Sequence, residues 1–250
     1  MDYRESLDYL YGLQRFGIKL GLDNIRQILH RLRHPEGHYP IVHVAGSNGK
    51  GSVCIGVAAI LGAAGRRVGL YSSPHLHSFT ERIQIDGQPI SEEEATALIR
   101  IVKDACDGIP VTFFEFTTAM ALLHFQRRQV EVAVLEVGMG GRLDATNVVT
   151  PSITVVTPVC RDHAEHLGSD LTSIAAEKAG IIKLQVPLVL GPQQPEALQV
   201  LVERAAGLQA PVYRYGQDFS SRPARQGFDY QGLKWSLPGM HPGLLGASAS

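Results

Sequence analysis

The feature that most constrains this chain is a glycine-rich turn directly after a short apolar run. Residues 42–45 read Val-His-Val-Ala, and residues 46–52 read Gly-Ser-Asn-Gly-Lys-Gly-Ser. An apolar run, a glycine-rich turn and a helical pattern in succession predict a strand, a loop and a helix of an α/β sheet. Glycines let backbone N–H groups approach phosphate oxygens, and the N-terminus of the following helix adds its dipole. The sequence therefore predicts a phosphate-binding loop.

The polar residues of this loop fit the triphosphate of a nucleotide. Lys50 supplies a point charge for the β- and γ-phosphates, and the hydroxyl of Ser52 can cap the helix or reach Mg²⁺. The spacing differs from the usual G-x-x-x-x-G-K-[ST], because Gly46 stands three residues before Gly49 and Gly51 separates Lys50 from Ser52. A purely structural strand-to-helix turn is the alternative interpretation.

The rest of the chain continues the alternation of strands and helices. Apolar, β-branched runs predict strands at 41–44, 68–71, 130–137, 153–156, 186–190 and 212–215. Helical spacing predicts two helices within 3–33 and others at 52–64, 91–106, 117–128, 174–180 and 196–206. Strands that are apolar throughout favour an α/β fold with a mostly parallel sheet and helices on both faces. Alternation over 228–235 predicts a small antiparallel hairpin near the C-terminus.

Composition excludes several classes of function. The net charge of −1 argues against a general nucleic-acid binder. The three cysteines are far apart without C-x-x-C spacing, which predicts reduced thiols. No apolar run approaches a membrane span, and the first ten residues are no signal peptide, so a cytoplasmic protein is expected.

Three further segments place polar residues at the carboxyl ends of predicted strands, where ligands bind in a parallel sheet. Ser73 follows the strand at 68–71, Glu136 closes the run at 130–137, and His163 follows the strand at 153–156. A buried carboxylate is costly unless it is paired or bound to a metal, so Glu136 is a candidate Mg²⁺ ligand. The alternatives are a salt bridge from Glu136 to Arg142, turn chemistry at Ser73 and an ordinary polar role for His163.

Lys178 lies in an alanine- and glycine-rich helical segment. This setting predicts an inward side chain, and a buried lysine loses its charge readily and can then be modified. A surface ion pair with Glu177 is the alternative.

Six strings in order resemble one known family. They are HVAGSNGKGS, YSSPHLHSFTERI, FFEFTT, LEVGMGGRLDATN, DHAEHLGSDLTSIAAEKAGIIK and LPGMH, and they span about residues 20–241. Together they are similar to the folylpolyglutamate synthase/dihydrofolate synthase family of the Mur ligase superfamily. The family usually has Thr at the position of Ser47 and often Leu at Met139, and both changes keep the chemistry. The resemblance implies a P-loop NTPase-like Mur ligase domain over residues 1–241.

The resemblance implies an ATP-dependent ligation. ATP phosphorylates a substrate carboxylate to an acyl phosphate, and the amine of L-glutamate attacks it to give an amide, ADP and phosphate. The acid is dihydropteroate or the γ-carboxylate of a reduced folate. The implied partners are these small molecules, with ATP and Mg²⁺, and neither nucleic acid nor membrane; the implied state is a monomer.

The resemblance also assigns roles to individual residues. The implied triphosphate-binding residues are Asn48, Gly49, Lys50, Gly51 and Ser52. The implied Mg²⁺ ligands are Ser73, Glu136 and His163. Of two implied Mg²⁺ ions, Ser52 also binds the first and His163 binds the second. The catalytic residues are Lys50, His163 and Lys178, the last matching a lysine that is carbamylated in many members. The residues implied to line the pterin pocket are Thr112, Leu143, Asp144 and Ala145.

The last nine residues depart from the family pattern. In the family LPGxH leads through an Asn-Ala-Ala-rich helix to a C-terminal α/β domain, whereas residues 242–250 read Pro-Gly-Leu-Leu-Gly-Ala-Ser-Ala-Ser. We therefore expect an atypical tail, no C-terminal glutamate ligase domain, weak ATP binding and little ligation, since ligation needs domain closure to exclude water. One alternative is an inactive remnant that binds nucleotide or folate. Others are an unrelated P-loop NTPase, and a Mur enzyme for cell-wall peptides.

Overall fold

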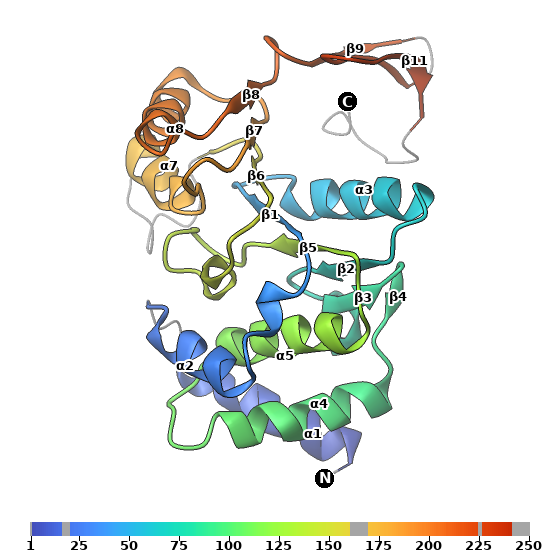
Figure 1. The fold of residues 1–250 in the computed structure, drawn as a ribbon, viewed down its shortest axis with the longest axis vertical. Helices are drawn as coiled ribbons and strands as arrows, with labels where there is room; N and C mark the ends of the chain where they lie inside the picture. Colours follow the sequence, from blue (N-terminus) through green and yellow to red (C-terminus); the bar gives the residue numbers. More distant parts are fainter. Residues whose placement is uncertain (1, 17–20, 161–169, 225–226, 242–250) are drawn as a thin grey trace.

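The architecture is an eight-stranded sheet flanked by helices, described here for residues 2–16, 21–160, 170–224 and 227–241 of a computed structural model (Figure 1). The strand order is β4-β3-β2-β5-β1-β6-β7-β8. Strands β2, β5, β1, β6, β7 and β8 run parallel, and β3 and β4 add an antiparallel edge beside β2. The predicted, mostly parallel sheet is confirmed. The bounds are β1 Ile41–Ala45, β2 Val68–Tyr71, β3 Ile83–Ile85, β4 Gln88–Pro89, β5 Val132–Glu136, β6 Ile153–Val156, β7 Leu188–Leu190 and β8 Val212–Arg214.

Helices cover both faces of the sheet. Because side chains alternate along a strand, Val42 and Val44 of β1 face α3 while Ile41 faces the side of α5. Helices α1, α2 and α4 complete the α5 side, and α7 and α8 share a core cluster with β6 and β7. The helices are α1 Tyr3–Gly12, α2 Asp23–Arg31, α3 Lys50–Ala63, α4 Glu92–Ala105, α5 Phe113–Arg127, α7 Leu171–Ala179 and α8 Pro195–Gly207. Short 3₁₀ turns are η1 Leu13–Phe16, η2 Pro35–Gly37, η3 Phe79–Arg82 and η4 Ala145–Val148.

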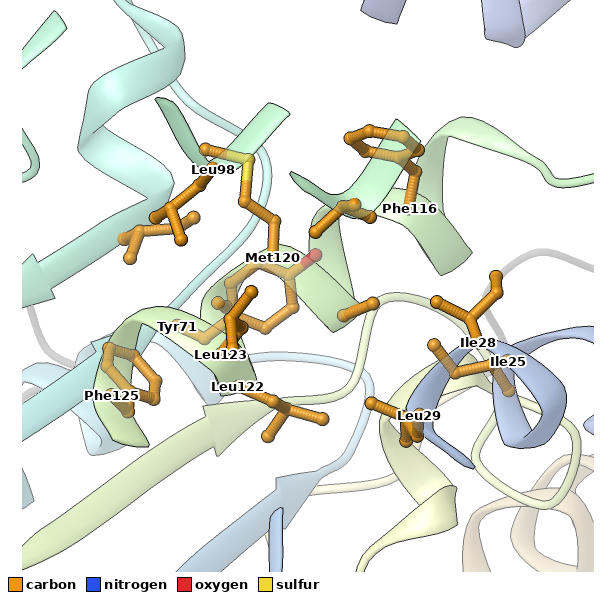
Figure 2. Close-up of a cluster of buried hydrophobic side chains, with 14 of the residues drawn as sticks. Ile25, Ile28, Leu29, Tyr71, Leu98, Phe116, Met120, Leu122, Leu123 and Phe125 are labelled. Carbon is orange, nitrogen blue, oxygen red and sulfur yellow. The ribbon is translucent and has the colours of Figure 1, made fainter. Parts of the chain in front are cut away.

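Helix α5 is the centre of the largest core cluster. Figure 2 shows its side chains packed between α2, α4 and β2, with Met120 beside Tyr71 and Leu98. Phe125 lies so close to β2 that a Cβ on Gly69 would stand 2.6 Å from its ring. A helix that is apolar on every side is one buried on every side, as α5 is over most of its length.

Helix α5 begins at Phe113, four residues before the predicted start. Thr112 caps it: its hydroxyl accepts from the N–H of Glu115 at 3.3 Å, and the Glu115 carboxylate accepts from the N–H of Thr112 at 2.8 Å. The apolar pattern alone misses this start, because the capping box comes before the periodic residues.

The C-terminal part forms a separate three-stranded antiparallel sheet. Its strands are β9 Ser220–Pro223, β10 Phe228–Gln231 and β11 Ser236–Met240, in the order β11-β10-β9. The predicted hairpin is confirmed, although its second arm begins at Ser236. Strand β9 was not predicted, because Ser-Ser-Arg-Pro carries no apolar alternation. Within the described ranges, no helix has the length and apolarity that a membrane span requires.

Candidate functional site

The glycine-rich loop joins the end of β1 to the start of α3 at the carboxyl edge of the sheet. Gly46 and Gly49 have φ of +145° and +81°, which L side chains rarely adopt. The Ser47 hydroxyl donates to the carbonyl of Cys160 and accepts from its N–H, both at 3.0 Å. Gly49 caps α3 without a side-chain hydrogen bond, so the first N–H groups of the helix remain available to an anion.

Ser52 lies inside α3 as its third residue and does not cap it. The predicted capping role is therefore wrong, and the role at a metal ion stays a prediction.

Two lysines converge on this loop from different parts of the chain. Lys50 Nζ donates to the carbonyls of Gly46 at 3.1 Å and Ser47 at 3.3 Å, and Lys178 Nζ donates to that of Gly46 at 2.9 Å. Lys178 is 3% exposed, so its predicted inward position is confirmed. The alternative pairing of Lys178 with Glu177 is wrong, because Glu177 binds Arg142 at 2.7 Å. Two lysine side chains therefore donate to the phosphate-binding loop.

Glu136 closes β5 next to the start of α3. Its carboxylate is buried and accepts from the N–H of Ser73 at 3.1 Å. A Cβ on Gly51 would stand 3.6 Å from both carboxylate oxygens, so the glycine keeps space open beside them. Burial raises the pKa of Glu136, an effect opposed by the Ser73 N–H, by Lys50 and by Arg82. Among the described residues, no cation pairs with Glu136 within 4.0 Å.

The alternative salt bridge from Glu136 to Arg142 is thus wrong, and the carboxylate suits a divalent cation. No cluster of three or more His, Cys, Asp or Glu residues in the described ranges could hold a metal. The remaining ligands of a Mg²⁺ at Glu136 would be hydroxyls, phosphate oxygens and water, which this ion accepts readily. Of the predicted metal ligands, Ser73 and Glu136 lie together, and His163 lies outside the described residues.

Asp144 is held by a chain of hydrogen bonds that begins in β1. Its Oδ1 accepts from the Thr146 hydroxyl at 2.5 Å and from the Thr146 N–H at 2.9 Å, and its Oδ2 accepts from the N–H of Met139 at 2.9 Å. His43 Nε2 lies 2.8 Å from the Thr146 hydroxyl oxygen. Because the single Thr146 proton serves the carboxylate, His43 must donate from Nε2, and its buried Nδ1 has no partner. Burial raises the pKa of Asp144, which these hydrogen bonds oppose.

His43 gives the fold a measurable dependence on pH. Burial, and then the charge of Lys183, lowers its pKa to about 3. Below pH 6.5 the unfolded chain takes up a proton that the folded chain refuses, so stability falls as pH falls. We expect His43→Gln, whose amide can still donate to Thr146, to remove up to about 1.4 kcal/mol per pH unit of this loss between pH 6 and 4. Urea denaturation across this range measures it, with the exposed His30→Gln as control; parallel curves for wild type and His43→Gln would contradict it.

The expected pterin residues lie on two segments, the start of α5 and the turn after β5, and an aromatic ring that sequence reasoning missed connects these segments. Thr112 donates its hydroxyl to Glu115 at 2.8 Å, and Asp144 holds the turn at Met139 through the Met139 N–H at 2.9 Å, so both side chains are engaged within their own segments. Phe114 of α5 is half-buried, and a Cβ on Gly138, after β5, would stand 2.5 Å from its ring. Leu143 is half-buried and Ala145 is buried on the same turn. In the sequence, only the string FFEFTT pointed to Phe114. An aromatic ring at this place suits a flat ligand.

Known proteins share both the sequence and the fold. Residues 44–231 match the Mur ligase middle domain family. The chain is 42% identical to the dihydrofolate synthase/folylpolyglutamate synthase of Bacillus subtilis over 260 residues, which is 96% of the chain and 60% of the relative. It is 37% identical to the folylpolyglutamate synthase of Lacticaseibacillus casei, over 98% of the chain and 60% of the relative.

The solved structures agree with these relatives. The apo form of L. casei FPGS superposes with a TM-score of 0.92 at 37% identity, over 96% of this chain and 62% of that one. E. coli FolC in complex with DHPP and ADP superposes with a TM-score of 0.90 at 36% identity, over 96% of this chain and 57% of that one. The chain thus spans about 60% of the length of the relatives it matches.

Proposed function

Since this chain belongs to the Mur ligase family through its middle domain, we propose that it carries the ATP site of a ligase that joins L-glutamate to a folate-type acid. One observation supports this most: the phosphate-binding loop, two lysines and a buried carboxylate, which pairs with no cation among the described residues, meet at one edge of the sheet. Residues 1–241 would form this ATP-binding domain. We take the acid to be dihydropteroate or a reduced folate, because the similar proteins are named for making dihydrofolate and folylpolyglutamate.

The proposed chemistry begins with transfer of the γ-phosphoryl group. The N–H groups of residues 48–52 and the Lys50 ammonium would hold the triphosphate. For this the Asn48 N–H leaves the carbonyl of Pro158, and Lys50 leaves its present carbonyl partners. Ser52, Ser73 and Glu136 would hold Mg²⁺, which supplies charge compensation for the phosphoryl oxygens. A carboxylate oxygen of the acid attacks the γ-phosphorus and ADP leaves; the glutamate amine then attacks the acyl carbon, loses a proton and expels phosphate.

Two predicted catalytic residues belong to the finer part of the proposal. Carbamylation would turn Lys178 from a cation into an anion able to bind a second Mg²⁺ together with His163. The burial of Lys178 beside Gly46 supports a role at the loop in either form. Intact-mass analysis after exposure to ¹³C-bicarbonate would reveal the carbamate. An unlabelled Lys178 would contradict carbamylation and the second Mg²⁺ site that depends on it.

We propose further that the protein is a monomer in the cytoplasm. The free thiols of Cys54 and Cys106 are buried and that of Cys160 is half-buried, as suits a reducing compartment. Light scattering of the purified chain tests the monomer.

Nucleotide binding with and without Mg²⁺ tests the ATP site. We expect a non-hydrolysable ATP analogue to bind the chain more tightly with Mg²⁺ than with EDTA. Glu136→Gln should abolish most of that difference, roughly tenfold or more, because the amide cannot hold the ion. Glu131→Gln is the matched control, since this exposed carboxylate lies beside the opposite end of β5 and pairs with Arg66. If Glu136→Gln retained the full Mg²⁺ effect, the proposed site would be wrong.

A further inference from the structure

Arg82 is a buried cation for which the described part of the chain provides no acidic partner. It is 8% exposed and ends η3, and no described carboxylate lies within 4.0 Å of it. The neighbouring Glu81 is engaged elsewhere, because it accepts from the N–H groups of Leu76, His77 and Ser78 at 2.8–3.0 Å. Glu136 acts on Arg82 only from beyond 4.0 Å. A buried charge without a counter-charge in contact is unfavourable, and an anionic ligand would compensate it.

The contacts of Arg82 leave its outer fork open. Its Nε donates to His75 Nδ1 at 2.7 Å, and its guanidinium carbon lies 5.2 Å from the centre of the Phe113 ring. His75 accepts at this nitrogen and therefore brings no charge through it; burial, and then Arg82, lowers its pKa. The N–H groups of both Nη atoms remain, in the geometry that matches the two oxygens of a carboxylate.

The strand register places this fork at the proposed active site. Strand β3 pairs with β2 so that Ile83 lies opposite Tyr71, and the carbonyl of Arg82 accepts from the N–H of Ser72 at 3.0 Å. Strand β2 also pairs with β5, and the next residue, Ser73, binds Glu136. Arg82 therefore lies at the same sheet edge as Glu136, with an aromatic ring of α5 on its other side.

We propose that Arg82 binds the carboxylate of the acid substrate through both Nη atoms. The triphosphate of ATP is assigned to the loop, Lys50 and the start of α3, which lie on the other side of Glu136, so Arg82 is not needed for it. The acid must place its carboxylate beside the γ-phosphate and its aromatic rings near α5, and Arg82 lies between these two places. This inference rests on the proposed function and assigns the residue that orients the attacking oxygen.

A pair of ligands that differ only in the carboxylate tests the assignment. Pteroate and the analogue with hydrogen in place of its carboxylate are titrated into the purified chain by calorimetry. We expect the wild type to prefer pteroate by roughly 10- to 100-fold. Arg82→Met should bind both ligands equally, with affinity for the analogue and for an ATP analogue unchanged. Arg66→Met, which removes an exposed arginine, is the matched control.

Arg82→Lys keeps the positive charge but loses the fork, and it serves if the methionine variant unfolds. Its preference for pteroate should lie several-fold below that of the wild type. A wild-type preference retained by both variants would overturn the assignment, as would a parallel loss of ATP-analogue affinity, which would make phosphate the anion. If the wild type bound neither pterin but bound the ATP analogue, the proposed acid class itself would fail.

Discussion

Replacement of Gly46 by alanine is expected to lower the free energy of unfolding by about 4 kcal/mol, near the upper end for a single substitution. The φ of +145° already disfavours any side chain. An added Cβ would overlap the Thr157 hydroxyl and stand 3.0 Å from the Thr157 carbonyl oxygen. Thr157 cannot move aside freely, because its N–H donates to the carbonyl of Ala45 at 2.8 Å as β6 runs beside β1. Relief therefore requires the loop to leave the sheet.

Gly49→Ala is the matched control in the same loop. Gly49 also has positive φ, but nothing lies within 4 Å of an added Cβ, so only the left-handed backbone is penalised, by about 1 kcal/mol. Urea denaturation of the two variants measures the difference. Equal losses would show that Thr157 exerts no steric restraint on the loop. Since the Gly46 carbonyl also accepts from Lys50 and Lys178, Gly46→Ala should displace both ammonium groups as well.

The sequence predicts the parts of this site that depend on neighbouring residues. The apolar run before the loop gave β1, and the polar residues after such runs gave the carboxyl edge at Glu136. The alanine-rich surroundings of Lys178 indicated its inward position. Each of these signals lies within a few residues of the feature it predicts, because alternation, periodicity and capping are local effects.

Pairings across the sheet could not be predicted in the same way. Lys178 reaches Gly46, and His43 reaches Thr146, only because β1 lies between β5 and β6 and brings segments over 100 residues apart together. The preference of Glu177 for Arg142 over Lys178 likewise depends on the turn after β5. Arg82 lies within one of the strings that resemble the family, but its lack of an acidic partner among the described residues appears only once β3 is paired with β2.

Lys50→Met is expected to weaken binding of the ATP analogue by roughly 100-fold or more, because it removes a charged contact to the β- and γ-phosphates. The same substitution should leave the free energy of unfolding unchanged or slightly higher. Lys50 is the first residue of α3, where a cation meets the positive end of the helix dipole, and its described partners are two carbonyls of its own loop. The substitution should therefore weaken binding strongly without lowering stability.

The comparison of affinity with stability distinguishes a ligand-binding lysine from a structural one. If the carbonyl contacts of Lys50 served mainly to hold the loop, Lys50→Met would lower both stability and affinity, as Gly46→Ala should. Lys103→Met is the control, since this exposed lysine lies over the Tyr9 ring, on the far side of the core from the loop. Affinity within threefold of the wild type would remove Lys50 from the phosphate site. A large loss of affinity at undiminished stability would show that Lys50 serves the bound triphosphate more than the fold of the empty loop.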